Sequence, residues 1–381
     1  MEGPRPARAQ EFAELMEFID RVFRPGQRGR RIYQRQYPHL YRPAPAYVAR
    51  NLVMRDGDDI VGSLAVHPLR LRLEEVTLPA GGVGAVGTHP ERRGEGIMTC
   101  LLQEAVRRMQ GCGHVLAVLG GDRQRYGWFG WENGGVRNTF LLTSRQLGPP
   151  TPAERRLPIR RLAVTPAVAR RLLAVDRQRP YGVERSRAQV RPLFERTSRD
   201  VWGCTAGGRF AYVVLAGPHH GARPYECVDE AGGDPEVAIS ILRVLMARHH
   251  RERLCAVAGP NPVDVALYRP HSASWERAAD GMVKIVNLAC LVELLEPLLR
   301  RRAAVRGVTG RFGLCMRDSR QNAELRIGEG PEYPVELGDR DMVTLVFGLL
   351  PVSEVFGAAP AFARLDGILP LPLHVPPLHH V

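Results

Sequence analysis

Lysine is almost absent from this chain. Lys284 is the only lysine among 381 residues, although lysine and arginine together number 53. The formal net charge of +13 is therefore carried almost entirely by arginine. A Walker phosphate loop requires a Gly-Lys-Ser/Thr sequence. The lack of lysine thus excludes a P-loop nucleotidase.

Three further absences narrow the class of protein. The seven cysteines include no Cys-x-x-Cys pair, no apolar run approaches the ~18 residues of a membrane span, and residues 1–10 lack the apolar core of a signal peptide. We therefore expect a cytoplasmic protein with reduced thiols and no membrane segment. A hydrophobic content of 44% and a charged content of 24% are ordinary for globular proteins, and 381 residues suit two or three domains.

The positive charge raises the question of nucleic-acid binding. One segment interleaves basic and aromatic residues, a pattern that can track a phosphate backbone and stack on bases. Its members are Arg21, Arg24, Arg28, Arg30, Arg31, Tyr33, Arg35, Tyr37 and Tyr41. The alternative is a solvated loop in a protein that uses arginine everywhere in place of lysine. We favour the second interpretation.

Residues 83–119 carry the strongest local pattern. A short apolar strand at 83–86 precedes a turn rich in glycine and arginine, and a helix follows from about residue 97. Met98, Leu101, Leu102, Ala105 and Met109 recur at the spacing of one helix face. Gly111 and Gly113 end this helix, and the apolar run 115–119 predicts a strand buried on both faces.

A glycine turn that opens a helix leaves backbone N–H groups unpaired and is a natural anion site. Two phosphate-binding patterns compete here. The stretch Gly82-Val83-Gly84-Ala85-Val86-Gly87 fits a dinucleotide fingerprint, but it does not open a helix, as that fingerprint requires. Arg93-x-x-Gly96, with a further glycine at Gly94, follows a strand and does open a helix. This arrangement resembles the pyrophosphate loop of the GNAT family of acetyl-CoA-dependent N-acetyltransferases.

The block Tyr126-Gly127-Trp128-Phe129-Gly130-Trp131 follows at a fitting distance. A Tyr-Gly-x-Phe-Gly-aromatic sequence in this place is similar to the Eis (enhanced intracellular survival) branch of that family. The resemblance implies an α/β (α+β) fold with tandem acetyltransferase folds and a sterol-carrier-like C-terminal domain.

Composition and patterning fit three such domains. A Gly-Pro-rich linker at 148–152 separates a catalytic domain at 1–148 from a degenerate acetyltransferase-like domain at 149–281, and a sterol-carrier-like domain follows at 282–381. In the first we expect four successive strands, including separate ones at 60–66 and 69–76. In the second, a helix at 234–249 begins with Asp234-Pro235-Glu236, a first turn that repels phosphate. In the third we expect a helix around Leu291–Leu298, strands at 309–317 and 322–328, and a helix capped by Asp339.

The resemblance also implies the site. Ala85 and Val86 would pair with the pantetheine arm of acetyl-CoA, and Gly121 and Asp122 would border it. The pyrophosphate would be held by Arg92, Arg93, Gly94, Glu95, Gly96 and Ile97. Tyr126 would act as the acid and the terminal carboxylate of Val381 as the base. The alternatives are core packing for Tyr126 and a frayed end for Val381, although a proline-rich apolar tail such as 369–378 suits a groove.

The expected function is therefore direct acetyl transfer from acetyl-CoA to a small-molecule amine, without an acyl-enzyme. Aminoglycosides, polyamines and lysine-type amines are acceptors of some relatives, and the family implies homo-oligomers, including hexamers. Histidine pairs such as 379–380 have no partners at ligand spacing, so we expect no metal. A non-catalytic acyl-CoA or lipid-binding protein is the main alternative, and a nucleic-acid-binding protein is the second.

Overall fold

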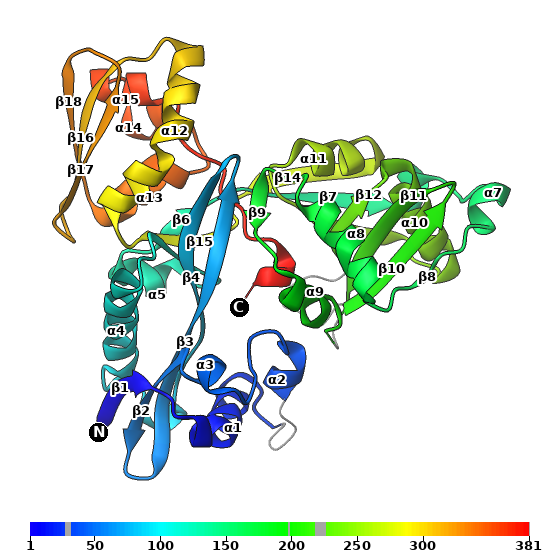
Figure 1. The fold of residues 1–381 in the computed structure, drawn as a ribbon, viewed down its shortest axis with the longest axis horizontal. Helices are drawn as coiled ribbons and strands as arrows, with labels where there is room; N and C mark the ends of the chain where they lie inside the picture. Colours follow the sequence, from blue (N-terminus) through cyan, green and yellow to red (C-terminus); the bar gives the residue numbers. More distant parts are fainter. Residues whose placement is uncertain (27–31, 197–198, 218–225, 381) are drawn as a thin grey trace.

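The computed structural model describes residues 1–26, 32–196, 199–217 and 226–380, which form three β-sheets flanked by helices (Figure 1). We refer to the parts built on these sheets as the first, second and C-terminal units. In the view of Figure 1, the first and second units lie side by side, and the end of the chain lies between them.

The first unit is built on an eight-stranded sheet, counted over the described residues. Seven strands run in the order β1 (Glu2–Pro6), β2 (Asn51–Asp56), β3 (Asp59–Leu73), β4 (Val76–Thr88), β5 (Leu116–Leu119), β15 (Gly281–Ile285) and β6 (Glu132–Gly134), and β9 (Tyr181–Val183) pairs with β3. The helices are α1 (Phe12–Phe23), α2 (Ile32–Gln36), α3 (Pro45–Val48), α4 (Ile97–Gly111) and α5 (Arg123–Tyr126), with short 3₁₀ turns η1 (Ala9–Glu11), η2 (Pro90–Arg92) and η3 (Gly127–Phe129).

Helix α4 and strand β5 confirm the prediction for residues 97–119. The predicted apolar positions Leu101, Leu102, Ala105 and Met109 are all at most 1% exposed. The prediction of two separate strands at 60–66 and 69–76 is wrong, because β3 runs unbroken from Asp59 to Leu73. Pro68 does not interrupt it. On the edge away from β4, β3 pairs with β2 as far as Ala65 and with β9 from Leu71, so Pro68 falls in the gap between these neighbours.

The second unit has a seven-stranded sheet in its described residues. The strand order is β14 (Ser272–Ala278), β7 (Arg137–Thr143), β13 (Arg253–Ala258), β12 (Cys227–Gly233), β11 (Arg209–Ala216), β10 (Arg199–Ala206) and β8 (Arg160–Arg161). Its helices are α6 (Ser144–Leu147), α7 (Pro152–Arg155), α8 (Pro166–Asp176), α9 (Arg187–Phe194), α10 (Pro235–Arg248) and α11 (Pro262–Tyr268), with the 3₁₀ turn η4 (Arg269–His271).

The C-terminal unit contains a small sheet ordered β17 (Gln321–Ile327), β16 (Gly310–Met316) and β18 (Glu332–Leu337). Helices α12 (Leu288–Arg306), α13 (Asp339–Phe347), α14 (Val352–Phe356) and α15 (Pro360–Leu365) accompany it, and the 3₁₀ turn η5 (Pro377–His379) lies near the end of the chain. Asp339 does not cap α13 as predicted. Its carboxylate instead accepts hydrogen bonds from the backbone N–H and hydroxyl of Ser319 and lies 3.6 Å from Lys284 Nζ.

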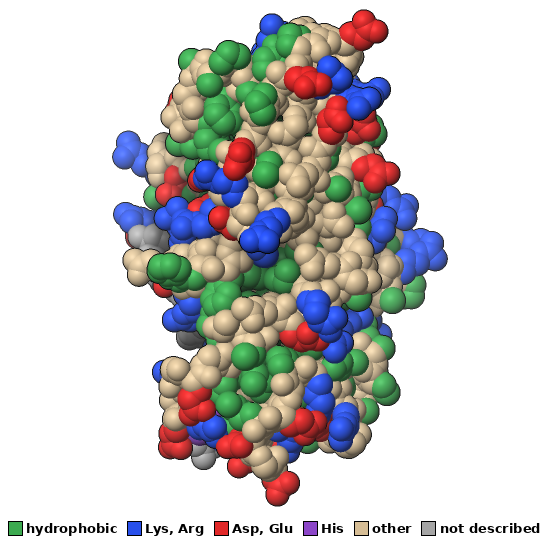
Figure 2. Space-filling view, turned by 90° about the vertical axis from the view of Figure 1, so that its left-hand side faces the viewer, with side chains coloured by type: hydrophobic (Ala, Val, Ile, Leu, Met, Phe, Trp, Pro, Cys, Tyr) green, Lys and Arg blue, Asp and Glu red, His purple; other side chains and the backbone are tan. Residues whose placement is uncertain are grey.

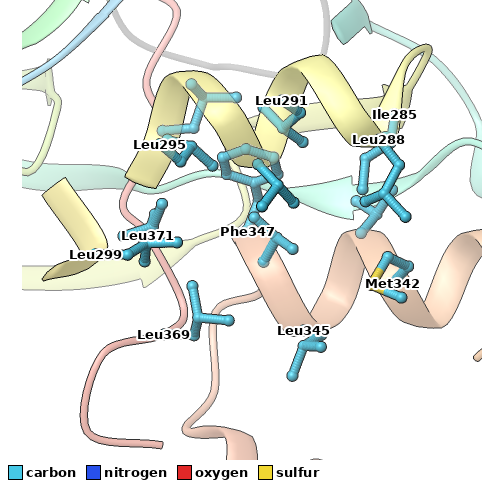
Figure 3. Packing of buried hydrophobic residues seen from close by; sticks show 14 of the residues in the cluster. Ile285, Leu288, Leu291, Leu295, Leu299, Met342, Leu345, Phe347, Leu369 and Leu371 are labelled. Atoms are coloured by element: carbon cyan, nitrogen blue, oxygen red, sulfur yellow. The ribbon is translucent and has the colours of Figure 1, made fainter. Parts of the chain in front are cut away.

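The units share strands and core. Strand β15 follows the second unit in sequence but pairs with β5 and β6 in the first sheet. Strand β7 precedes the linker but pairs with β13 and β14 in the second sheet. Leu291 and Leu295 of α12 pack with Phe347 of α13 and Leu371 of the tail in one continuous core, which also includes residues of β3, β4 and β5 (Figure 3).

Two surface properties bear on the expected partners. None of the described helices is long and apolar enough to cross a membrane. The basic segment buries two of its three tyrosines, since Tyr33 and Tyr41 are 7% and 2% exposed and their ring centroids lie 5.2 Å apart. Those two rings are thus not available to stack on bases. Arg28, Arg30 and Arg31 lie outside the described residues. Figure 2 shows basic and acidic side chains interspersed on one face of the molecule.

Candidate active site

The two central parallel strands of the first sheet separate along their length. Strand β4 pairs with β5 only through Ala80, Gly81 and Gly82, yet β4 continues to Thr88 while its other edge stays paired with β3. Beyond Gly82, the edge of β4 that faces β5 has no ladder partner among the described residues. Its backbone N–H and C=O groups are therefore available to an extended ligand lying in the gap.

A bulge marks this free edge. Ala85 has a φ of 48°, the register against β3 shifts here, and the Ser63 hydroxyl donates a hydrogen bond of 3.2 Å to the Ala85 carbonyl. A left-handed conformation at a residue other than glycine is costly and must be held by its surroundings. The predicted pantetheine-binding residues, Ala85 and Val86, thus lie in a distorted and unpaired part of β4.

The glycine loop lies between the end of β4 and the start of α4. Gly94 and Gly96 have φ values of 88° and 77°, and Gly96 is the N-cap of α4. A side-chain carbon added at either glycine would meet nothing within 4 Å. Because Gly96 has no side chain to cap the helix, the first backbone N–H groups of α4 open onto free space. The helix dipole makes this opening favourable for a diphosphate.

The arginines of the loop differ in their surroundings. Arg92 forms ion pairs with Asp56 at 2.5 Å and with Glu95 at 2.7 Å, so Arg92 ties the loop to the β2–β3 hairpin. Arg93 is exposed. Of the predicted pyrophosphate-binding residues, Ile97 is buried and anchors the first turn of α4, while Gly94 and Gly96 form the opening.

Tyr126 lies at the end of α5, directly beyond β5. Asp122 caps this helix by accepting a hydrogen bond of 2.8 Å from the backbone N–H of Gln124. The Tyr126 ring packs against the backbone of Gly121 so closely that a Cβ there would collide with it. Burial raises the pKa of the Tyr126 phenol above its ordinary value, with Arg125 opposing the shift. The phenol is therefore protonated at neutral pH and can serve as an acid.

The C-terminal tail is packed between the units. The backbone N–H of Val136 donates to the Leu373 carbonyl at 2.7 Å, and the N–H of Val375 donates to Asp280 Oδ2 at 2.6 Å. Leu369, Leu371, Leu373 and Leu378 are all at most 6% exposed. The prediction that this tail occupies a groove is confirmed for residues 369–378. The predicted base, Val381, lies outside the described residues.

Two arginines of the second unit hold the end of the tail. Arg196 donates a hydrogen bond of 3.0 Å to the Leu378 carbonyl, and Arg185 Nε donates to His379 Nε2 at 2.9 Å. Burial, together with the positive charge of Arg185, lowers the pKa of His379 well below its ordinary range. His379 is therefore neutral at physiological pH.

A pocket forms where the tail meets the carboxyl end of β5. Its cavity volume is about 60 Å³, and it is lined by the end of β5 with Gly120, by Asp280 and the start of β15, and by tail residues that include His379 and His380. Gly120 is one residue from Gly121, which the Tyr126 ring contacts. The pocket and Tyr126 therefore lie at the same end of the first sheet.

Sequence patterns missed several of these groups. The spacing of His379 and His380 suggests nothing beyond a possible metal site, and Asp280, Arg185 and Arg196 carry no local signal. Contacts between residues so far apart in sequence cannot be inferred from spacing. Among the described residues, no group of three or more His, Cys, Asp or Glu side chains could hold a metal ion.

Comparisons with known proteins agree with this arrangement. Residues 4–134 match the model of the acetyltransferase (GNAT) domain. The solved structure of a GCN5-related N-acetyltransferase from Anabaena variabilis is 16% identical, with a TM-score of 0.69 over 99% of both chains. A GCN5-related N-acetyltransferase from Kribbella flavida is 17% identical, with a TM-score of 0.67 over 99% of this chain and 97% of that one. No curated protein matches the chain in sequence at a significant level.

The chain thus contains a GNAT acetyltransferase domain and is an acyltransferase with the expected α/β fold. Eis1 from Mycobacterium abscessus is a further structural neighbour, 15% identical with a TM-score of 0.63 over 98% of this chain and 99% of that one. At this level of identity the likeness concerns the fold. The chain and these neighbours therefore share one overall fold, in which two units built on sheets are followed by a further α/β unit.

Proposed function

We propose that this protein is an acetyl-CoA-dependent N-acetyltransferase that moves the acetyl group directly to an amine. One observation carries the proposal. The free edge of β4 beyond Gly82 lies beside the open glycine loop at the start of α4, and together they fit an extended cofactor that ends in a diphosphate.

The residues of the chain fall into three roles. Gly94, Gly96 and Ile97 would present backbone N–H groups to the pyrophosphate, and Arg93 would add positive charge. Ala85 and Val86 would pair with the pantetheine arm. Arg92, which is tied to Asp56 and Glu95, would hold the loop in shape, while Gly121 and Asp122 would border the thioester.

Acetyl transfer requires two proton movements. The amine nitrogen attacks the thioester carbonyl, the carbon–sulfur bond breaks, and the sulfur leaves as a thiolate that needs a proton. Tyr126 supplies this proton, which its raised pKa keeps available. The attacking amine, with a pKa of ~10, must lose its protons to a base. The terminal carboxylate of Val381 takes this role, and the anchoring of Leu378 and His379 supports it.

Finer assignments rest on the resemblance to the Eis branch. The likeness to Eis1 of Mycobacterium abscessus supports an Eis-like enzyme. We extend the proposal to a cytoplasmic homo-oligomer whose C-terminal unit is sterol-carrier-like. Its domains follow one another along the sequence at 1–148, 149–281 and 282–381, except that β7 pairs in the second sheet and β15 in the first. Aminoglycosides, polyamines and lysine-type amines, which are acceptors of some relatives, are the candidate acceptors.

Replacement of Tyr126 by Phe tests the function. We expect thiol release from acetyl-CoA in the presence of amines for the wild type, and a fall in kcat of about 100-fold in Tyr126→Phe. The ring contact with Gly121 remains in the variant, so coenzyme A binding measured by calorimetry should be unchanged. Tyr333→Phe, in the C-terminal unit, removes a hydroxyl elsewhere and should retain full activity.

Other results would favour the alternatives. Coenzyme A binding without thiol release for any amine of a broad panel would indicate a non-catalytic acyl-CoA-binding protein. If the wild type fails to bind coenzyme A at all, the proposed cofactor site is wrong.

A further inference from the structure

Asp280 is a buried carboxylate with one oxygen unused. Its side chain is 5% exposed. One oxygen, Oδ2, accepts a hydrogen bond of 2.6 Å from the backbone N–H of Val375 and lies 3.1 Å from Nδ1 of His374. The other oxygen, Oδ1, is buried and has no hydrogen-bond partner among the described residues. Buried carboxylate oxygens are normally hydrogen-bonded, because an oxygen that gives up its hydrogen bonds to water and gains no new partner raises the free energy of the folded state.

This carboxylate lines the pocket at the end of β5. The remainder of the lining is mostly apolar or glycine, and its apolar members include Leu69, Leu119, Met282 and Leu373. The other polar members are His379 and His380, so Asp280 is the one carboxylate among the described lining residues.

Neither of the two histidines in the lining supplies a competing cation. His374 lies outside the lining and contacts Oδ2, the oxygen that the Val375 N–H also uses. Arg185 Nε donates to Nε2 of His379, which must therefore be unprotonated at that nitrogen. Nε2 of His380 donates its N–H to the carbonyl oxygen of Val375 at 2.9 Å, and burial lowers the pKa of His380 below its ordinary value. Among the buried side-chain atoms of the described lining residues, Asp280 Oδ1 is thus the one acceptor left without a donor.

We propose that Asp280 binds the ammonium group of the acceptor, and that the acceptor is a compact amine with a single positive charge and an apolar body. This inference rests on the proposed acetyltransferase function, because the pocket lies at the thioester end of the cofactor site. Asp280 Oδ1 receives one N–H of the ammonium, and the leucine, valine and methionine side chains cover the rest of the molecule. A polyamine would bring further ammonium groups against apolar side chains that offer them no partner.

The first test compares acceptors in wild type and Asp280→Asn. Asparagine keeps an oxygen for the Val375 N–H but removes the negative charge. With phenethylamine as the probe, we expect KM for the amine to rise at least tenfold in the variant, while KM for acetyl-CoA stays within twofold. Asp200→Asn, a change at an exposed ion pair of the second unit, should leave both constants unchanged. An unchanged KM for phenethylamine in Asp280→Asn would overturn the inference.

The second test uses the wild type alone and does not depend on how the variant folds. Phenethylamine should half-saturate the enzyme at a concentration at least tenfold lower than that at which 2-phenylethanol, its uncharged counterpart, half-inhibits it. The value of kcat/KM should also be higher for phenethylamine than for spermine. Equal affinity for the alcohol, or a preference for spermine, contradicts the proposed acceptor class.

Binding measured without turnover separates this inference from the proposed function. If phenethylamine raises the melting temperature of wild type but not of Asp280→Asn, and no thiol is released, the ammonium site stands and the acetyltransferase proposal fails. If both proteins turn over the amine with the same KM, the acetyltransferase proposal stands and the ammonium site fails.

Discussion

At the scale of the residue, the second unit is dominated by a buried charge network. Glu230 accepts hydrogen bonds from Arg185 and from the hydroxyl of Tyr212, both at 2.5 Å, and Arg179 pairs with Asp264 at 3.0 Å. These groups lie where β12 continues beyond its short pairing with β13, the place that corresponds to the gap between β4 and β5. Side chains of the unit itself therefore occupy the second gap.

Glu230 should make stability depend on pH in acid. Burial alone would raise its pKa, but Arg185 and Arg179 outweigh burial and lower the pKa to about 2, from 4.5. Because the folded pKa lies below the unfolded one, the stabilisation is complete above about pH 4.5 and is lost as the pH falls toward 2.

We expect Glu230→Gln to lower the free energy of unfolding at pH 7 by about 3 kcal/mol, since Arg185 loses the closer of its two buried charge partners and keeps only Asp176 at 3.5 Å. Between pH 4.5 and 2, the melting temperature of the variant should fall less steeply than that of wild type. Glu236→Gln, at a side chain that is 81% exposed, is the control and should behave as wild type. Parallel pH profiles for Glu230→Gln and wild type would show that the pKa is not lowered.

At the scale of the element, the two units differ at the start of one helix. In the first unit, the N-cap of α4 is Gly96, which has no side chain, and the N-terminus of the helix is open. In the second, the N-cap of α10 is Asp234, whose carboxylate accepts a hydrogen bond from the N–H of Val237 at 3.0 Å, and Pro235 and Glu236 follow. The second helix is thus already capped and carries negative charge, as its sequence predicted, so it does not attract phosphate.

Gly96→Ala should separate backbone strain from cofactor binding. Alanine at a φ of 77° costs about 1 kcal/mol, and it narrows the opening onto the first N–H groups of α4. We expect a loss of about 1 kcal/mol in stability together with at least a tenfold increase in the Kd for coenzyme A. Gly207→Ala, at a φ of 57° with nothing within 4 Å, carries similar strain in the second unit. It should lose stability without loss of coenzyme A affinity, and the same affinity in both variants would refute a role for Gly96.

At the scale of the whole molecule, the tail joins all three units. It leaves the C-terminal unit beside Val346, crosses the end of the first sheet at Val136, and ends against the second unit at Arg196. Arg196 also donates to the Gln36 carbonyl at 2.9 Å, so one buried side chain links the tail to the first unit as well. The second unit therefore positions the chain end near the site of the first.

Arg196→Met should weaken this arrangement while it keeps most of the side-chain volume. Two carbonyl oxygens lose their donor, for which we expect a cost of about 2 kcal/mol in stability. If the tail supplies the base, kcat should fall about tenfold while KM for acetyl-CoA stays unchanged, because the base acts only in the chemical step. The control is Arg191→Met, a 73% exposed arginine of the same unit. Unchanged kcat in Arg196→Met would argue against a catalytic tail.

Local signals explain what the sequence predicted well. The apolar face of α4, the glycine loop and strand β5 each follow from the order of a few adjacent residues, and the cap of α10 was visible in Asp234-Pro235-Glu236. The sequence pattern does not indicate strand β18, and it predicts two strands where β3 is one. Pairing partners rather than local composition decide where these strands begin and end. The same reason applies to Asp339, whose partners lie in another loop and in β15.

By itself, the sequence determined the cofactor side of this protein, since helix periodicity and the conformations open to glycine are properties of neighbouring residues. Only the tertiary structure decided the acceptor side. The contacts of Val375 with Asp280 and of Leu378 with Arg196 join residues 95 and 182 positions apart. Such contacts form when separate units pack around the tail, and no local pattern of side chains records which distant partner a carboxylate or a guanidinium will meet.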